Sequence, residues 1–220
     1  MPRRKVLLRA GECYHVYNRG NNHQPIFFDQ ANYLFFLQRL RDFVTKEAAD
    51  IVAYCLMPNH YHLLVRLNTD QFSNAMQSFG QSYTNAINNR YERVGSLFQG
   101  RFQAIHVDRD EYLLHLSRYI HLNPVPSLVR RPEDWEFSSY RDYIGLRQGT
   151  LPRCEFILRQ FAPPISPAAR SSRADDAACR CAYRRFVEAG SGRLDSKIQH
   201  LLLESTREIS PAAASSRADA

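Results

Sequence analysis

Residues 50–67 read DIVAYCLMPNHYHLLVRL and contain two apolar runs on either side of a Pro-Asn pair. Apolar runs of this length, rich in β-branched and aromatic residues, are typical of buried strands. Pro58–Asn59 is a turn signal, so residues 50–57 and 60–67 are predicted to form a β-hairpin. This hairpin is the centre of the predicted fold, and the other elements are placed around it.

Hydrophobic periodicity predicts further elements on both sides of the hairpin. Residues 12–19 and 102–107 are predicted strands, and residues 30–46 have apolar residues at helical spacing. A long amphipathic helix is predicted after Asp70, with apolar residues on one face: Phe72, Met76, Phe79, Tyr83 and Ile87. The order strand, helix, strand, strand, helix, strand is the split βαβ arrangement. We therefore predict an α+β, ferredoxin-like fold, an antiparallel sheet with helices on one face.

A further helix is predicted to follow the last strand. Asp108 and Glu111 have the spacing of a capping box at its start. Because Pro124 disfavours helical geometry in the residue before it, the helix is predicted to end at Asn123. Residues 126–146 are predicted to form a loop that packs through three aromatic side chains, Trp135, Phe137 and Tyr140.

The composition divides the chain into three parts. Residues 1–9 form a basic arm without an acidic residue, residues 10–146 form the predicted domain, and residues 147–220 form a C-terminal helical and irregular extension. Within the extension, residues 162–178 are rich in Ala, Ser and Pro and are predicted to be a linker. Residues 207–220 are expected to be a mobile tail. No pattern assigns a role to the extension.

Charge and composition limit the possible functions. The chain has 220 residues, of which 44% are hydrophobic, enough for one ordinary domain with an appendage. Its net charge of +7 favours a polyanionic partner, most often nucleic acid. Neither a membrane span of roughly 20 apolar residues nor a secretion signal is present, so we expect no membrane partner and a cytoplasmic location. The five cysteines include no CxxC pair and are predicted to be reduced thiols.

His60 and His62 are candidate metal ligands. Side chains two residues apart on a strand share a face, so both imidazoles can reach one divalent ion. Two ligands are too few for a closed structural zinc site, and an open site that keeps positions for water or substrate fits better. Two histidines on a sheet face that bind nothing remain the alternative, so a third ligand and a reactive group are needed.

Tyr119 and Asn123 are the candidates for these two roles. They are four residues apart on the predicted helix and therefore share a face. A tyrosine can act as a covalent nucleophile, although its phenol needs a nearby base or cation because it is a weak nucleophile when neutral. An asparagine offers a carbonyl oxygen that suits a hard divalent cation. Spacing alone leaves core packing open as the role of Tyr119.

These motifs, in this order, resemble those of the HUH-type single-tyrosine transposases, and most closely those of the REP-associated tyrosine transposase branch. The resemblance rests on LMPNHYHLLV at residues 56–65 and on YIHLNPV at residues 119–125. GSLFQGRF at residues 95–102 and WEFSSY at residues 135–140 are similar to the linking and following segments of that branch. The resemblance covers about residues 10–145 and implies a ferredoxin-like nuclease domain that cuts and rejoins single-stranded DNA.

The resemblance also implies roles for individual residues. His60 and His62 correspond to the metal ligands, Tyr119 to the nucleophile, and Asn123 to a further ligand that is often Gln in relatives. The implied cofactor is a divalent metal, Mg²⁺ or Mn²⁺. Attack of the tyrosine on phosphorus would give a 5′-phosphotyrosine link and a free 3′-OH, so rejoining would need no ATP. The absence of a GxxxxGK[ST] loop agrees with this expectation.

The implied substrate is hairpin DNA from repetitive extragenic palindromes, and the implied location is the cytoplasm at the nucleoid. Six basic residues are predicted to contact DNA phosphates: Arg3, Arg4, Lys5, Arg90, Arg93 and Arg101. A monomer is favoured, and a homodimer that exchanges the tyrosine helix is the alternative. Three other functions remain open: a non-catalytic, sequence-specific nucleic-acid-binding regulator, a hydrolytic metal nuclease in which water attacks, and a replication initiator or relaxase. The last is disfavoured because no second tyrosine obviously pairs with Tyr119.

Overall fold

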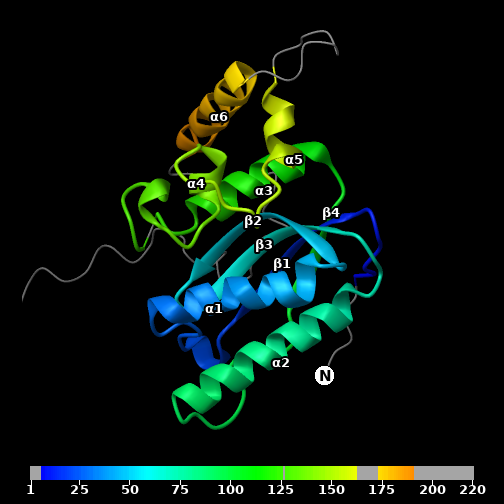
Figure 1. Ribbon diagram of the computed structural model, residues 1–220, viewed down its shortest axis with the longest axis vertical. Helices are drawn as coiled ribbons and strands as arrows, with labels where there is room; N and C mark the ends of the chain where they lie inside the picture. Colours follow the sequence, from blue (N-terminus) through cyan, green and yellow to red (C-terminus); the bar gives the residue numbers. More distant parts are fainter. Residues whose placement is uncertain (1–5, 126, 163–172, 191–220) are drawn as a thin grey trace, which may run out of the picture.

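A four-stranded antiparallel sheet forms the middle of the molecule (Figure 1). The computed structural model describes residues 6–125, 127–162 and 173–190. The sheet has the order β2-β3-β1-β4. Its strands are β1 (Cys13–Arg19), β2 (Ala49–Met57), β3 (His60–Leu67) and β4 (Gln103–Val107). Each strand lies where the alternation or the apolar runs predicted it. Strand order and connections confirm the predicted ferredoxin-like fold.

Two crossover helices, α1 (Gln30–Leu40) and α2 (Phe72–Arg90), lie on one face of the sheet (Figure 1). Helix α1 starts at a capping box in which the Asp29 side chain accepts a hydrogen bond from the backbone N–H of Asn32. A short π-helical turn, η2 (Arg41–Thr45), continues it. The apolar faces of both helices bury aromatic side chains against the sheet: Tyr33, Phe36, Phe72, Phe79 and Tyr83. This packing is the larger of the two hydrophobic cores.

The second face of the sheet is covered by α3 (Asp110–Leu122) and by the C-terminal elements (Figure 1). These elements are η3 (Pro132–Asp134), α4 (Tyr140–Tyr143), α5 (Glu155–Leu158), η4 (Arg159–Phe161) and α6 (Arg173–Glu188). Together they form a second core, in which Ile120, Ile157 and Tyr183 pack on the same side as Leu64. The described part of the extension therefore belongs to the folded unit. No helix within the described residues is long and apolar enough to cross a membrane.

Three local expectations differ from the structure. Helix α3 begins at Asp110 with Arg109 as its N-cap and no side-chain cap, so the predicted capping box is wrong because Asp108 lies one residue too early. The predicted loop 126–146 contains two short helical turns, although its aromatic residues do pack on the core. Helix α6 begins at Arg173, so the end of the predicted linker is helical. Residues 163–172 of the linker and the tail 207–220 lie outside the described residues.

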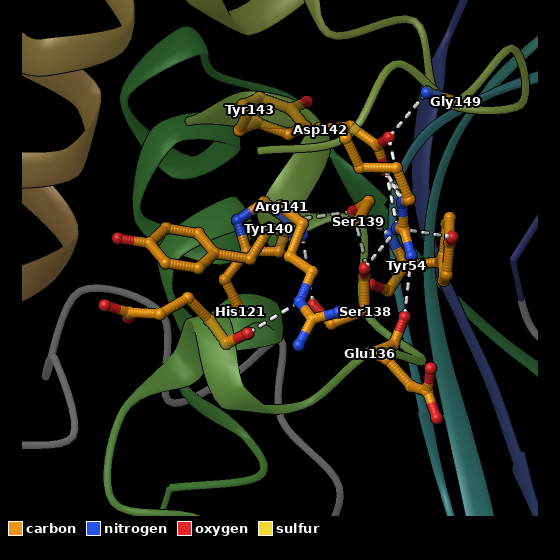
Figure 2. Close-up of polar contacts among 12 residues, drawn as sticks. Tyr54, His121, Glu136, Ser138, Ser139, Tyr140, Arg141, Asp142, Tyr143 and Gly149 are labelled. Atoms are coloured by element: carbon orange, nitrogen blue, oxygen red, sulfur yellow. Dashed lines mark hydrogen bonds and ion pairs between the residues drawn. The ribbon is translucent and has the colours of Figure 1, made fainter. Parts of the chain in front are cut away.

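A polar network ties the segment after α3 to the edge strand β2 (Figure 2). Arg147 pairs with the buried carboxylate of Asp142 at 2.6 Å and also donates to the Tyr54 hydroxyl at 3.0 Å. Backbone bonds add to this attachment, since the N–H of Ser139 donates to the Tyr54 carbonyl at 3.0 Å. The buried charge is thus fully paired, and the segment forms a rigid layer over the sheet.

Candidate active site

The two central strands bring the histidines to the face of the sheet that α3 covers. Strands β1 and β3 are antiparallel, with Arg19 opposite His60 and Tyr17 opposite His62. Because side chains two apart share a face, His15 also points to this side. His15 and His62 are fully buried, and His60 is partly buried. The site therefore lies at the end of β1 and the start of β3.

Three polar groups converge at this point. The ring centroids of His60 and His62 are 5.1 Å apart. The Asn123 amide lies between the rings, with Oδ1 3.2 Å from His60 Nε2 and Nδ2 3.4 Å from His62 Nε2. Ligand atoms on an octahedral ion are roughly 3 Å apart when each is about 2.1 Å from the ion. Asn123 thus lies at about this distance from a nitrogen of each ring, so the three groups could hold one small divalent cation.

The histidines have the protonation state that metal binding needs. Burial lowers the pKa of His60 to about 4, and the charge of Arg19 lowers it further. The Asn123 amide oxygen, which can accept a hydrogen bond from the protonated ring, opposes this shift. Burial lowers the pKa of His62 well below its usual value, and repulsion from His60 and His15 adds to this effect. Both rings are neutral at pH 7 and so have a lone pair for a cation. No cluster of three or more His, Cys, Asp or Glu suited to a metal occurs in the described part of the chain.

Tyr119 lies beside the histidines, one turn before Asn123 on α3. Its ring centroid is 5.5 Å from that of His62 and 6.3 Å from that of His15, with the rings edge to face in both pairs. The side chain is partly buried, so one part of the ring remains accessible. The structure thus brings together all four residues that the motifs singled out for chemistry, as the helical and strand spacings predicted.

The opposite side of α3 is anchored to the C-terminal elements through His121. This imidazole is fully buried, with Nδ1 2.7 Å from the Tyr183 hydroxyl of α6. Its Nε2 is 2.8 Å from Ser139 Oγ (Figure 2). Burial, with the charge of Arg147, lowers its pKa to about 3. Because His121 lies between Tyr119 and Asn123 in the sequence, its two hydrogen bonds add to the packing that holds α3 with those residues toward β3.

Two residues of the site, His15 and Arg19, were missed from the sequence. His15 Nε2 is 2.9 Å from His62 Nδ1, and the Arg19 guanidinium lies across the ladder from His60 and donates to the Gln99 side chain. The alternation in residues 12–19 does place both on one face of a strand. Only the pairing of β1 with β3 shows that His15 and Arg19 lie on the same face of the sheet as His60 and His62.

The predicted DNA-contacting residues fall into two groups. Arg101 is exposed, and Arg90 and Arg93 are near the end of α2. Arg90 pairs with Asp29 at 2.6 Å, and the Arg93 guanidinium lies over the Phe28 ring, 5.3 Å from its centroid. A backbone hydrogen bond from Asn21 to Leu97 joins the β1–α1 connection to the α2–β4 connection. Another, from Phe27 to Pro58, holds the β1–α1 connection at the sheet end that contains His60. The other three, Arg3, Arg4 and Lys5, lie outside the described residues.

Comparison with known proteins identifies the class of protein. The family model described as "Transposase IS200 like" matches residues 11–123, which include the histidine strand and the tyrosine helix. The chain therefore belongs to the family of IS200-like transposases, enzymes that cleave and transfer DNA. Searching the curated proteins gives no match.

Comparison with solved structures agrees with the fold. The chain is similar to a protein described as "Structure of the REP associates tyrosine transposase bound to a REP hairpin", with a TM-score of 0.54 and 20% sequence identity. The match covers 79% of this chain and 98% of the other. At this level of identity the likeness concerns the fold.

Proposed function

We propose that this protein is a metal-dependent tyrosine transposase that cleaves and rejoins hairpin-containing single-stranded DNA through a 5′-phosphotyrosine intermediate at Tyr119. One observation supports it most: Tyr119 lies 5.5 Å, between ring centroids, from His62, while Asn123 on the same helix contacts both histidines. A nucleophile and a cation-binding set next to each other are what phosphoryl transfer requires.

His60, His62 and Asn123 would hold the divalent ion, Mg²⁺ or Mn²⁺. When bound, such an ion polarises a non-bridging phosphate oxygen and offsets the charge that develops in the transition state. Arg19 lies opposite His60 in the ladder of β1 and β3 and would contact the same phosphate group. The scissile phosphate would then lie between the sheet end and Tyr119.

Tyr119 would attack phosphorus in line with the 3′ oxygen of the preceding nucleotide. The bond from the phenolic oxygen to phosphorus forms as the bond to the 3′ oxygen breaks, the phenol loses its proton to solvent, and the 3′ oxygen gains one. One phosphodiester replaces another, so the 3′-OH of a second strand can reverse the step and join the DNA. This exchange accounts for transposition without a nucleotide cofactor.

The partner would be a DNA hairpin with unpaired flanks. The net charge of +7 favours a polyanion, and Arg19, Arg90, Arg93 and Arg101 lie around the connections at the end of the sheet that contains His60. Arg3, Arg4 and Lys5 would extend this surface along the stem. A DNA substrate would also account for a cytoplasmic, nucleoid-associated location.

The test is incubation with a single-stranded hairpin oligonucleotide and Mn²⁺ or Mg²⁺, followed by denaturing electrophoresis. We expect a denaturation-resistant protein–DNA complex whose modified peptide contains Tyr119. The Tyr119→Phe variant should bind the hairpin within about twofold of wild type and form no complex. Tyr112→Phe, which removes a hydroxyl from the same helix, is the matched control and should leave the complex unchanged.

Two outcomes would contradict the proposal. Cleavage that leaves 5′-phosphate ends without a covalent complex would indicate a hydrolytic metal nuclease. Binding to the hairpin without any cleavage in either metal, by wild type and Tyr119→Phe alike, would indicate a non-catalytic regulator.

A further inference from the structure

Asn59 has a side-chain orientation that its surroundings define completely. It lies in the turn between β2 and β3, and its Nδ2 donates a hydrogen bond to the backbone carbonyl of His23 at 3.2 Å. A backbone carbonyl can only accept, so the amide cannot be reversed, and Oδ1 must face His60 Nδ1 at 2.7 Å. Because Oδ1 can only accept as well, Nδ1 of His60 must hold the proton. A neutral imidazole has one ring proton, so Nε2 of His60 is left with its lone pair.

The loop that supplies the His23 carbonyl is held rigidly against this turn. Asn22 and His23 adopt left-handed backbone conformations, with φ of 50° and 59°. Backbone hydrogen bonds from Gly20 to the Asn59 carbonyl at 2.8 Å and from Ile26 to the Pro58 carbonyl at 2.9 Å join the loop to the turn. Unfavourable conformations of this kind persist only where the surrounding contacts define them. The His23 carbonyl is therefore a defined acceptor for Asn59.

His15 occupies the equivalent position for the second imidazole. Its Nε2 is 2.9 Å from His62 Nδ1, and one proton lies between these two nitrogens. When that proton is on His62 Nδ1, the lone pair of His62 Nε2 faces Asn123. The single amide of Asn123 then meets two lone pairs, and its oxygen faces one of them whichever way the amide is turned. The amide oxygen and the Nε2 lone pair that it faces are two acceptors in contact, which is unfavourable unless a cation lies between them.

We propose that Asn59 and His15 are positioning residues that hold the protons of His60 and His62 on Nδ1, so that both Nε2 lone pairs face Asn123 before any metal arrives. The inference rests on the metal site of the proposed function and adds the residues that orient it. Such outer contacts of metal-binding histidines typically contribute 10–100-fold to metal affinity or activity.

The first measurement uses the metal-free full chain with ¹⁵N-labelled histidine. Long-range ¹H–¹⁵N correlation spectra report which ring nitrogen holds the proton. For both His60 and His62 we expect the proton on Nδ1 and a free lone pair on Nε2. A proton on Nε2 of His60 would overturn the role of Asn59, and a proton on Nε2 of His62 would overturn the role of His15. This reading needs no variant of the fully buried His15.

The second measurement is Mn²⁺ affinity by calorimetry, without DNA. Asn59→Ala is expected to weaken binding about 10–100-fold and to give His60 a mixture of both proton positions. Asn59→Asp keeps an oxygen that accepts from Nδ1, so it should restore the single proton position and most of the affinity. Asn68→Ala, at an exposed position just after the far end of β3, is the matched control and should bind Mn²⁺ as wild type does.

Wild-type affinity in a folded Asn59→Ala variant, shown by an unchanged circular dichroism spectrum, would overturn the inference. The variant His60→Ala separates this failure from a failure of the proposed function. If His60→Ala loses Mn²⁺ binding and Asn59→Ala does not, the metal site stands and the positioning role is wrong. If His60→Ala binds Mn²⁺ like wild type, the metal site itself is wrong.

Discussion

At the scale of single residues, burial keeps the side chains of His60 and His62 uncharged at pH 7. His62 and His15 are fully buried in the middle of the sheet, where a charged imidazole would be costly. The two rings contact each other, and His62 also contacts Asn123. The burial that lowers the pKa of His62 leaves a lone pair available for a cation. Removal of the imidazole from water therefore affects both the stability of the fold and the ability of the ring to bind a metal ion.

Acidification is expected to destabilise the metal-free protein. The folded-state pKa values of His60 and His121, about 4 and about 3, lie below the usual 6.5. Below pH 6.5 the unfolded chain takes up protons that the folded chain does not, so the free energy of unfolding falls as pH decreases. Each such histidine contributes up to about 1.4 kcal/mol per pH unit between about pH 6 and pH 4. Urea unfolding at pH 7, 6 and 5 measures this slope.

In the variant His121→Gln, the free energy of unfolding should fall less steeply with decreasing pH, by the contribution of one histidine. The exposed His106→Gln is the matched control. Equal slopes in wild type and His121→Gln would show that His121 does not remain neutral in the folded protein.

At the scale of elements, α3 holds the site together because its faces have different partners. Leu116 and Ile120 pack into the core under the sheet's second face. Tyr119 and Asn123 face the histidines, and His121 bonds to α6 and to Ser139. A helix held on several sides cannot rotate, so the nucleophile and the amide keep their positions relative to β3. In a similar way, hydrogen bonds from the β1–α1 connection hold the turn that contains Asn59 in position.

A methyl group at Gly20 is expected to disturb that connection. A Cβ built there would lie 1.9 Å from the backbone carbonyl oxygen of Gln24, which cannot move without shifting the loop. Gly20→Ala should lower the free energy of unfolding by about 1–3 kcal/mol, a typical overpacking cost. In Gly80→Ala, the matched control inside α2, the new methyl meets nothing within 4 Å and should add up to about 1 kcal/mol. Urea unfolding of both variants checks the prediction, and equal stability of Gly20→Ala and wild type would contradict it.

At the scale of the whole molecule, one chain contains every group of the proposed site. Helix α3 packs on the sheet that contains His60 and His62, and the extension covers it from the other side through Tyr183 and Val187. Removing α3 from its own sheet would expose the whole second core. This arrangement favours a self-contained monomer over a dimer that exchanges tyrosine helices.

Mixing two inactive variants tests this organisation. Tyr119→Phe lacks the nucleophile, and His60→Ala lacks a metal ligand, so neither alone should form the covalent complex. If each site belongs to one chain, an equimolar mixture should stay as inactive as the separate variants. If two chains exchange helices, mixed dimers would contain one complete site, and the covalent complex would reappear on electrophoresis.

Much of the fold could be read from local sequence. The hairpin around Pro58–Asn59, the two crossover helices and the strand order follow from periodicity and turn residues, and the structure agrees with them. The four candidate site residues were predicted from two short motifs, because side chains two apart on a strand or four apart on a helix share a face. The start of α3 was wrong, since a capping pattern at Asp108 is only a weak local preference.

The sequence by itself therefore determined the elements, the face on which each candidate residue lies and, through the motifs, the family. Only the tertiary structure decided that His15 meets His62 across 47 residues of chain, that Arg19 lies opposite His60, and that α6 supports the tyrosine helix through Tyr183. The physical reason is the distance along the chain over which each kind of interaction acts. Periodicity and turn preference act over a few residues, whereas strand register and helix docking depend on contacts between segments far apart in the chain, which form only when both cores close.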